Sequence, residues 1–347
     1  MGPDLVNVTQ VLVPDQIHGA GSAPADKASI DMDIVVINFN TREHLRACLA
    51  SIRTQPVGRV LVVDNASTDG SAGMVRREFP WVELRANAAN SGYGTAANQA
   101  LAECQASYSL LLNSDTRLKP GAIVALTAYL EAHPRAGVVG PRLLNPDGSP
   151  QPSCYSFPTP LHVLLEESTL IRLIRRLPGV REWLPRTAQR RGNGAVAWVL
   201  GAALALRVEA FRQVGGFDET FFLYAEEIDL SYRLRQAGWE THFAADASVI
   251  HTGGASSSQQ RGDMLVQFYA SLVHFYRRHY TRWQLTQLIW IMKSIVLARW
   301  LRDAARRRLD RERPSAPWLA EDVSAWRRIL FGPAAREQAG EESLASR

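Results

Sequence analysis

The first residue suited to chemistry is Asp115, an acidic side chain that directly follows an apolar run. Leu110–Leu112 predict a buried strand, and Asn-Ser-Asp at residues 113–115 ends it. Ligands of open parallel α/β sheets bind just beyond the carboxyl ends of the strands. A carboxylate there, among small polar residues, suits a divalent metal that carries a phosphate. An ordinary Asn-Ser-Asp turn explains the same residues equally well.

A second acidic cluster, formed by Glu226, Glu227 and Asp229, follows the aromatic stretch 221–224. In a helix, Glu226 and Asp229 share one face while Glu227 points elsewhere. Burial beside other carboxylates raises the pKa of a carboxyl group and makes it a candidate general base. The alternative is a solvated charged helix face without a chemical role.

One histidine, His251, ends the short apolar run Val249-Ile250 and is followed closely by Gly253 and Gly254. The glycines allow close backbone approach, and a neutral imidazole suits a borderline cation such as Mn²⁺. A single histidine is more often structural, so both interpretations stay open.

Polar residues also mark the ends of the other predicted strands: Asn38 and Asn40 at the end of the first, 64–69 after the second, and 90–98 after the third and into the next helix. Together with residues 113–115, these clusters predict a nucleotide pocket at one edge of a sheet. Asp64 is placed to accept a hydrogen bond from the imide N–H of a pyrimidine base. Its alternative role is to cap the helix that follows.

Small residues follow an aromatic side chain at Trp198, Gly201 and Ala202. Such a sequence can form a flat floor for a sugar ring. A buried, closely packed strand is an equally good interpretation.

The elements that must position these residues alternate between strand and helix. Apolar runs predict strands over residues 33–40, 59–63, 82–84 and 109–112, and helical spacing predicts intervening helices that start after Thr41, after Gly70 and at Thr95. We therefore expect an α/β fold with a single Rossmann-like, mostly parallel sheet flanked by helices. After residue 120 the pattern predicts a helix to about residue 133, a strand at 138–139 and excursions over the sheet at 141–160. A helix and loop at 161–192 and a helical segment at 217–235 follow. The last predicted elements are a short strand at 249–250 and long helices from 264 to 310.

The composition is that of an ordinary globular protein, with 347 residues, 46% hydrophobic and 21% charged. The three cysteines are widely spaced and odd in number, so the sequence indicates neither a disulfide framework nor a thiolate metal site. A reducing, cytoplasmic setting is the simplest inference. We divide the chain into a flexible leader (1–30), a catalytic domain (31–262, with a nucleotide-binding half 31–116 and an acceptor half 117–262), a basic amphipathic helical extension (263–312) and a polar tail (313–347). The leader has no signal-peptide pattern.

The helical extension carries most of the positive charge. Residues 261–313 hold twelve Lys/Arg against four Asp/Glu, a surplus of eight, whereas the whole chain has +5. The stretch 283–297 is apolar but interrupted by Gln284, Gln287 and Lys293, so we predict no spanning helix. Tryptophans beside arginines across 283–308 favour peripheral contact with a bilayer interface, at the inner face of the cytoplasmic membrane. A helix packed on the catalytic domain, or a dimer contact, is the alternative.

Six motifs in order carry a family resemblance: VVINFNT, VVDNASTDGS, NSGYGTAAN, LLNSDT, GGFDETFFLYAEEIDLSYR and VIHTGG. Over residues 32 to 280 the chain resembles the inverting family 2 glycosyltransferases of the GT-A fold. It looks most like the rhamnosyltransferase-type members that build bacterial cell-surface polysaccharides. The resemblance implies a nucleoside-diphosphate sugar (dTDP- or UDP-linked), a saccharide or lipid-linked acceptor, and Mg²⁺ or Mn²⁺ as cofactor. Nucleic acid is not an expected partner, and the oligomeric state is not predicted.

The resemblance also implies residue roles. It implies that Asp115, with His251, holds the metal and that Glu227, with Glu226 and Asp229 as alternatives, is the catalytic base. The nucleotide contacts it implies are Asn38, Asn40, Asp64, Asn65, Asn90, Gly92, Asn98 and Ser114. To these we add Trp198, Gly201 and Ala202 as the candidate acceptor floor.

Two positions depart from the family pattern. Asn113 stands where the first acidic residue of an Asp-x-Asp motif is usual, and Glu227 stands where Asp is usual. These departures leave open a non-catalytic nucleotide-sugar-binding protein of the same fold. A dinucleotide oxidoreductase is a further alternative, because residues 92–97 match G-x-G-x-x-A. That motif lies after the third predicted strand rather than the first, and hydride transfer gives the acidic clusters no role.

Overall fold

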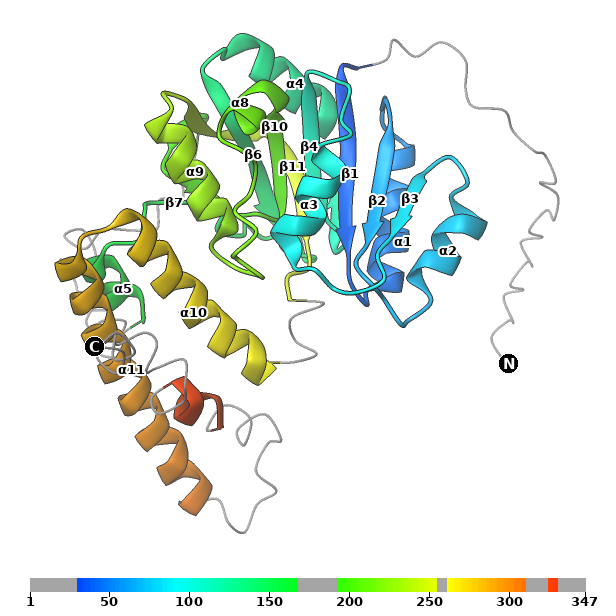
Figure 1. Cartoon of the computed structure of the whole chain (residues 1–347). Coiled ribbons are helices and arrows are strands. Elements are labelled where there is room, and N and C mark those ends of the chain that lie inside the picture. The colour runs from blue at the N-terminus through cyan, green and yellow to red at the C-terminus, as the bar shows by residue number, and fades with distance from the viewer. Residues whose placement is uncertain (1–29, 168–191, 255–260, 310–323, 330–347) are drawn as a thin grey trace, which may run out of the picture.

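A nine-stranded sheet forms the centre of the protein, and helices cover both of its faces (Figure 1). The computed structural model describes residues 30–167, 192–254, 261–309 and 324–329. The predicted leader and polar tail, and most of the helix and loop predicted at 161–192, lie outside these ranges.

Four parallel strands make the first half of the sheet: β1 (Met32–Asn38), β2 (Val60–Asp64), β3 (Glu83–Ala86) and β4 (Tyr108–Asn113), in the order β3-β2-β1-β4. Successive side chains of a strand point to opposite faces of the sheet. Accordingly, Ile34 and Val36 pack into one core cluster, and Val35 and Ile37 pack into another. Both faces are buried, which explains the uninterrupted apolar runs.

The second half of the sheet is mixed. It consists of β10 (Ala203–Arg207), β6 (Ala136–Leu144), β11 (Glu240–His251), β5 (Thr116–Leu118) and β8 (Gly194–Val196). β10 pairs antiparallel with β4 and β6, and β5 and β8 pair antiparallel with β11, so six of the nine strands share one direction. The predicted mostly parallel sheet is confirmed, with these antiparallel strands as an addition. β7 (Cys154–Tyr155) and β9 (Trp198–Val199) form a separate two-stranded sheet.

The helices divide between the faces. Side chains of α1 (Arg42–Arg53), α2 (Ser71–Glu78) and α4 (Ala122–Ala132) belong to the first core cluster, and those of α3 (Tyr93–Leu101), α8 (Val208–Gln213) and α9 (Glu226–Gln236) belong to the second. A third cluster joins α5 (Pro160–Glu167), α10 (Arg261–His279), α11 (Arg282–Leu309) and the short helix 324–329. The long helices predicted from residue 264 are therefore α10 and α11.

Several local predictions need correction. The short strand expected at 249–250 is the end of β11, a strand of twelve residues. The helix expected over 217–235 begins only at Glu226, because Tyr224 and Ala225 adopt positive φ angles of 69° and 67°. The region 141–160 includes the end of β6 rather than excursions alone. Thr41 precedes α1 as predicted but makes no capping hydrogen bond. Instead, Asp69 accepts from the backbone N–H of Arg42 at 2.7 Å.

Within the described ranges, no helix is long and apolar enough to cross a membrane.

Candidate active site

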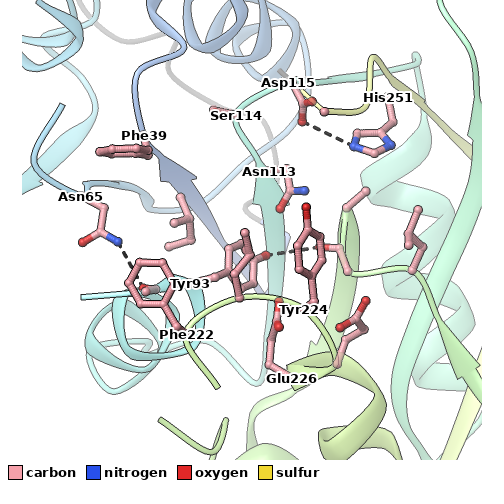
Figure 2. A pocket seen from close by; sticks show the side chains of 18 of the residues that line it. Phe39, Asn65, Tyr93, Asn113, Ser114, Asp115, Phe222, Tyr224, Glu226 and His251 are labelled. Atoms are coloured by element: carbon pink, nitrogen blue, oxygen red, sulfur yellow. Dashed lines mark hydrogen bonds and ion pairs between the residues drawn. The ribbon is translucent and has the colours of Figure 1, made fainter. Parts of the chain in front are cut away.

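A cavity of about 260 Å³ opens at the carboxyl ends of β1 and β4 (Figure 2). Asp115 and His251 lie at one side of it, and Glu226 lies at another, with Asn113 and Tyr224 between them. Segments far apart in the sequence thus meet at the sheet edge where ligands of such folds bind.

Asp115 and His251 are brought together by strand pairing. Asp115 lies in the turn between β4 and β5, and His251 ends β11, where it is paired with Thr116 of β5. The Nε2 atom of His251 lies 3.5 Å from Oδ1 of Asp115, and both side chains are buried. This spacing lets a carboxylate oxygen and an imidazole nitrogen approach the same ligand.

The tautomer of His251 is set by Gln151. The amide Nε2 of Gln151 donates to Asn145 at 3.1 Å, which turns its Oε1 toward His251. Nδ1 of His251 then donates to that Oε1 at 2.8 Å, and the lone pair of a neutral imidazole at Nε2 faces Asp115. Metal-binding histidines are held by this kind of outer hydrogen bond.

The residues present fit a divalent metal that shares its coordination with a ligand. Asp115 and His251 supply one oxygen and one nitrogen, and no group of three His, Cys, Asp or Glu side chains able to hold a metal occurs in the described ranges. Mg²⁺ and Mn²⁺ at phosphate sites take few protein ligands and complete their shell with phosphate oxygens and water.

The two glutamates Glu226 and Glu227 begin α9 and both line the cavity. The left-handed turn at residues 224–225 directs the start of the helix at the sheet edge. One carboxylate oxygen of each, Oε2, is buried without a hydrogen-bond partner among the described residues. These oxygens are available to a ligand.

The two carboxyl groups are not equivalent. Burial, and then the neighbouring Glu227, raises the pKa of Glu226 well above its ordinary value. Burial also raises the pKa of Glu227, but backbone N–H groups of Glu227, Gly201 and Ile228 oppose that rise by donating to its carboxylate. Hydrogen bonds to the charged form favour ionisation. More backbone N–H groups therefore stabilise the ionised form of Glu227 than that of Glu226.

Asp229 does not line the cavity. It is fully buried and accepts hydrogen bonds from Arg233 of its own helix at 2.7 Å and from His279 of α10 at 2.6 Å. The prediction that Glu227 points away from a face shared by Glu226 and Asp229 is wrong, because Glu227 faces the cavity and Asp229 links α9 to α10.

Of the predicted nucleotide contacts, Asn65, Asn90, Gly92 and Ser114 line the cavity. Asn65 organises this group by donating to Oδ1 of Asn90 at 2.8 Å and to the carbonyl of Gly92 at 3.1 Å.

The other four predicted contacts do not line the cavity and bind other parts of the protein. Asn38 donates to Asp64 at 2.7 Å, and both side chains are buried. Asn40 accepts from the backbone N–H of Thr68 at 2.8 Å. Asn98 exchanges hydrogen bonds with the backbone of Phe217. These four residues fix the loops rather than facing the cavity.

Only part of the predicted acceptor floor lines the cavity. Gly201 and Ala202 line the cavity, and Gly201 lies against the side chain of Glu227. Trp198 does not line it; its ring stacks on Tyr155 at 4.3 Å, and its Nε1 donates to the carbonyl of Ser156.

Several lining residues were not predicted, among them Phe39, Tyr93, Phe222 and Tyr224. Tyr93 donates to the carbonyl of Gly201 at 3.2 Å, and burial together with nearby carboxylates, Glu226 foremost, raises its pKa well above the ordinary value. Phe39 and Phe222 lie on the same side of the cavity as Asn65 (Figure 2). The aromatic residues beside the acidic cluster were the signal for Phe222 and Tyr224, whereas Phe39 gave none.

In the G-x-G-x-x-A match, neighbouring loop residues pack closely against both glycines, Gly92 and Gly94. A Cβ on Gly92 would meet the carbonyl oxygen of Phe222 at 2.6 Å, and one on Gly94 would meet the side chain of Phe217 at 3.3 Å. Packing against residues 217–222 therefore accounts for both glycines without a dinucleotide.

Comparison with known proteins identifies the class that this fold and cavity define. Residues 33–177 match the family described as glycosyl transferase family 2, and residues 180–309 match glycosyl transferase family group 2. The chain belongs to glycosyltransferase family 2.

Individual relatives are more specific. The chain is 31% identical over 284 residues to the N-acetylglucosaminyl-diphospho-decaprenol L-rhamnosyltransferase of Mycobacterium tuberculosis, covering 77% of this chain and 91% of that protein. It is 27% identical over 233 residues to the pre-mycofactocin glycosyltransferase of the same organism, covering 66% of this chain and 44% of that protein. Among solved structures, it is similar to a mannosyltransferase from Pyrobaculum calidifontis in complex with GDP-Man and Mn²⁺, with 17% identity, a TM-score of 0.48, and coverage of 93% of this chain and 88% of that one.

Proposed function

We propose that the chain is an inverting glycosyltransferase that moves a sugar from a nucleoside-diphosphate sugar to a saccharide or lipid-linked acceptor in cell-surface polysaccharide synthesis. The observation that carries the proposal is the cavity, which has the Asp115–His251 pair on one side and the Glu226–Glu227 pair on another. Inversion by one displacement needs this arrangement, with the leaving group and the base on different sides of the sugar.

The donor nucleotide would occupy the side of the cavity formed by Asn65, Asn90 and Ser114. Phe39 and Phe222 offer apolar ring surface there for a base. The buried Asn38–Asp64 pair would hold the shape of this wall rather than contact the base directly. Asp115 and His251 would hold Mg²⁺ or Mn²⁺, which when bound offsets the negative charge on the departing diphosphate.

Glu227 is the proposed base. Backbone N–H groups of its own helix and of Gly201 donate to its carboxylate, which stabilises the ionised form and fixes its orientation. It would take the proton from the acceptor hydroxyl as that oxygen attacks the anomeric carbon. A positioned general base contributes on the order of 10²–10⁴ in rate. Glu226, whose pKa is raised well above its ordinary value by burial and then by Glu227, would stay protonated and hydrogen-bond to a sugar or acceptor oxygen.

The acceptor would enter past Gly201 and Ala202, because this strip borders Glu227. The Mycobacterium tuberculosis relative is an N-acetylglucosaminyl-diphospho-decaprenol L-rhamnosyltransferase, which supports rhamnose as the sugar and a lipid-linked acceptor for this chain. We propose dTDP-rhamnose as the leading donor. A lipid-linked acceptor in turn supports a cytoplasmic protein bound peripherally at the inner face of the membrane.

A donor screen that detects released nucleoside diphosphate tests the proposal. The full chain with Mn²⁺ and an extract of lipid-linked saccharides should release dTDP from dTDP-rhamnose faster than UDP from UDP-sugars, and NMR of the product should show inverted anomeric configuration. Retained configuration would contradict the mechanism. Tight sugar-nucleotide binding without turnover on any donor would instead support a non-catalytic binding protein.

A further inference from the structure

One face of α11 exposes large apolar side chains to solvent. Trp283 and Trp290 are each 69% exposed, Leu301 is 54% exposed and Leu297 is 43% exposed. These four residues, here called the α11 stripe, recur at intervals of seven, seven and four. At 3.6 residues per turn they lie along one side of the helix. They are four of the nine exposed large hydrophobic residues in the described part of the chain.

The exposure of the stripe is not the result of a loosely packed helix. The opposite side of α11 contributes Leu288, Met292 and Val296 to the third core cluster, and all three are buried. Between the stripe residues, the other exposed side chains on this side are the small ones of Thr286, Ser294 and Ala298. The stripe is thus a continuous apolar ridge on a firmly packed helix.

Positive charges border the stripe. Arg282 and Lys293 lie on one flank of the helix and Arg302 lies on the other, given a turn of about 100° per residue. The described part of α11 before Arg302 holds no acidic residue. Tryptophan and leucine on one side with basic residues along the edges is the pattern of helices that lie in a bilayer interface.

We propose that the α11 stripe inserts into the interface of an anionic lipid bilayer, with the axis of α11 parallel to the membrane plane. The charge pattern favours this occupant over a second copy of the chain, because two copies meeting through this face would bring like charges together. The α11 stripe would be the surface through which the proposed peripheral membrane contact is made. The inference rests on the proposed function only for the purpose of that contact, which is access to a lipid-linked acceptor.

The arrangement also connects the membrane to the cavity. α10 packs between α11 and the catalytic helix, and its His279 binds Asp229 of α9. Phe268 of α10 packs edge-to-face on Tyr224, which lines the cavity. A membrane bound by α11 would therefore lie next to a helix pair that contacts the wall of the cavity.

Vesicle flotation of the full chain tests the proposal. Wild-type protein should float with phosphatidylglycerol-containing vesicles at low salt, bind weakly to phosphatidylcholine vesicles, and be released at high salt because screening weakens the attraction. W283A/W290A should lower the partition coefficient by about tenfold or more, since each tryptophan can bury a large ring surface in the interface. K293E should lower it by about fivefold on anionic vesicles only.

Trp81→Ala is the matched control, because Trp81 is also exposed, at 38%, but lies between α2 and β3. It should bind vesicles like wild type. Equal binding of W283A/W290A and wild type would overturn the proposal. The proposal would also be overturned if the wild-type protein formed a dimer that did not float with vesicles and the W283A/W290A variant were a monomer. Transfer to a short water-soluble acceptor should be unchanged in W283A/W290A; if wild type shows no transfer to any acceptor, the proposed function fails while the vesicle result still stands.

Discussion

Gly92→Ala should destabilise the protein and weaken nucleotide binding together, because Gly92 is where two cavity loops touch. Its φ of 86° and ψ of 167° lie in a region reserved for glycine. A Cβ would meet the carbonyl oxygen of Phe222 at 2.6 Å and its Cα at 3.1 Å. Both are backbone atoms, so a side-chain rotation cannot relieve the contact. The adjacent N–H of Tyr93 donates to the same carbonyl at 2.9 Å.

The expected cost follows from these two effects. The backbone conformation alone costs a non-glycine residue about 1–3 kcal/mol. Separating the loops adds the loss of the Tyr93 hydrogen bond, about 1 kcal/mol. We expect a loss of about 3 kcal/mol, which lowers the melting temperature by at least about 5 °C. Movement of the loop also displaces Asn90, so the nucleotide dissociation constant should rise by about tenfold or more.

Gly121→Ala provides the control. Gly121 also has a positive φ, 80°, but a Cβ there meets nothing within 4 Å. This substitution should cost about 1 kcal/mol and leave nucleotide affinity unchanged. Thermal unfolding and calorimetry with dTDP would measure both variants. If Gly92→Ala matched Gly121→Ala in stability and affinity, the argument that loop contact shapes the nucleotide wall would be refuted.

Three further predictions concern charged and polar groups around the site. Burial raises the pKa of Glu226, so the folded state binds the carboxyl proton of Glu226 more tightly than the unfolded state does. This proton binding stabilises the folded protein at low pH, and the stabilisation is lost as the pH rises through the raised pKa. Glu226→Gln cannot ionise, so its advantage in melting temperature over wild type should grow with pH, and parallel curves would contradict this. Gln151→Leu removes the acceptor for Nδ1 of His251 and should weaken Mn²⁺ affinity in the presence of dTDP by about 10–100-fold, measured by calorimetry; unchanged affinity would show that His251 is not a ligand. His279→Ala removes one of the partners of the fully buried Asp229 and should cost about 2 kcal/mol in urea unfolding, whereas a change below about 0.5 kcal/mol would show that the remaining arginine partners suffice.

Local pattern was enough to predict the parallel half of the sheet and the polar strand ends. Strands buried on both faces produce uninterrupted apolar runs, and β1, β2 and β4 have such runs. The strands in the second half of the sheet were harder to predict from the sequence, for identifiable reasons. β11 contains Asp246 and a register shift between Ala244 and Ser248, which break its apolar pattern.

Which polar residues face the cavity depended on contacts that no local pattern contains. Asn38 and Asp64 end neighbouring strands as predicted, but they lie opposite each other in the β1–β2 register and bind each other. Asp229 resembled its acidic neighbours in sequence, and its role as a link depends on where α10 packs. Phe39 gave no signal, because its place in the wall is set by the loop after β1.

The most direct test of the central claim is sugar transfer by Glu227→Gln compared with its dTDP affinity. The substitution keeps the shape of the side chain and removes the group that would accept the proton. We expect transfer to fall by at least about 100-fold while the dissociation constant for dTDP with Mn²⁺ stays within about twofold of wild type. Transfer at the wild-type rate, with dTDP bound normally, would contradict the assignment of Glu227 as the base.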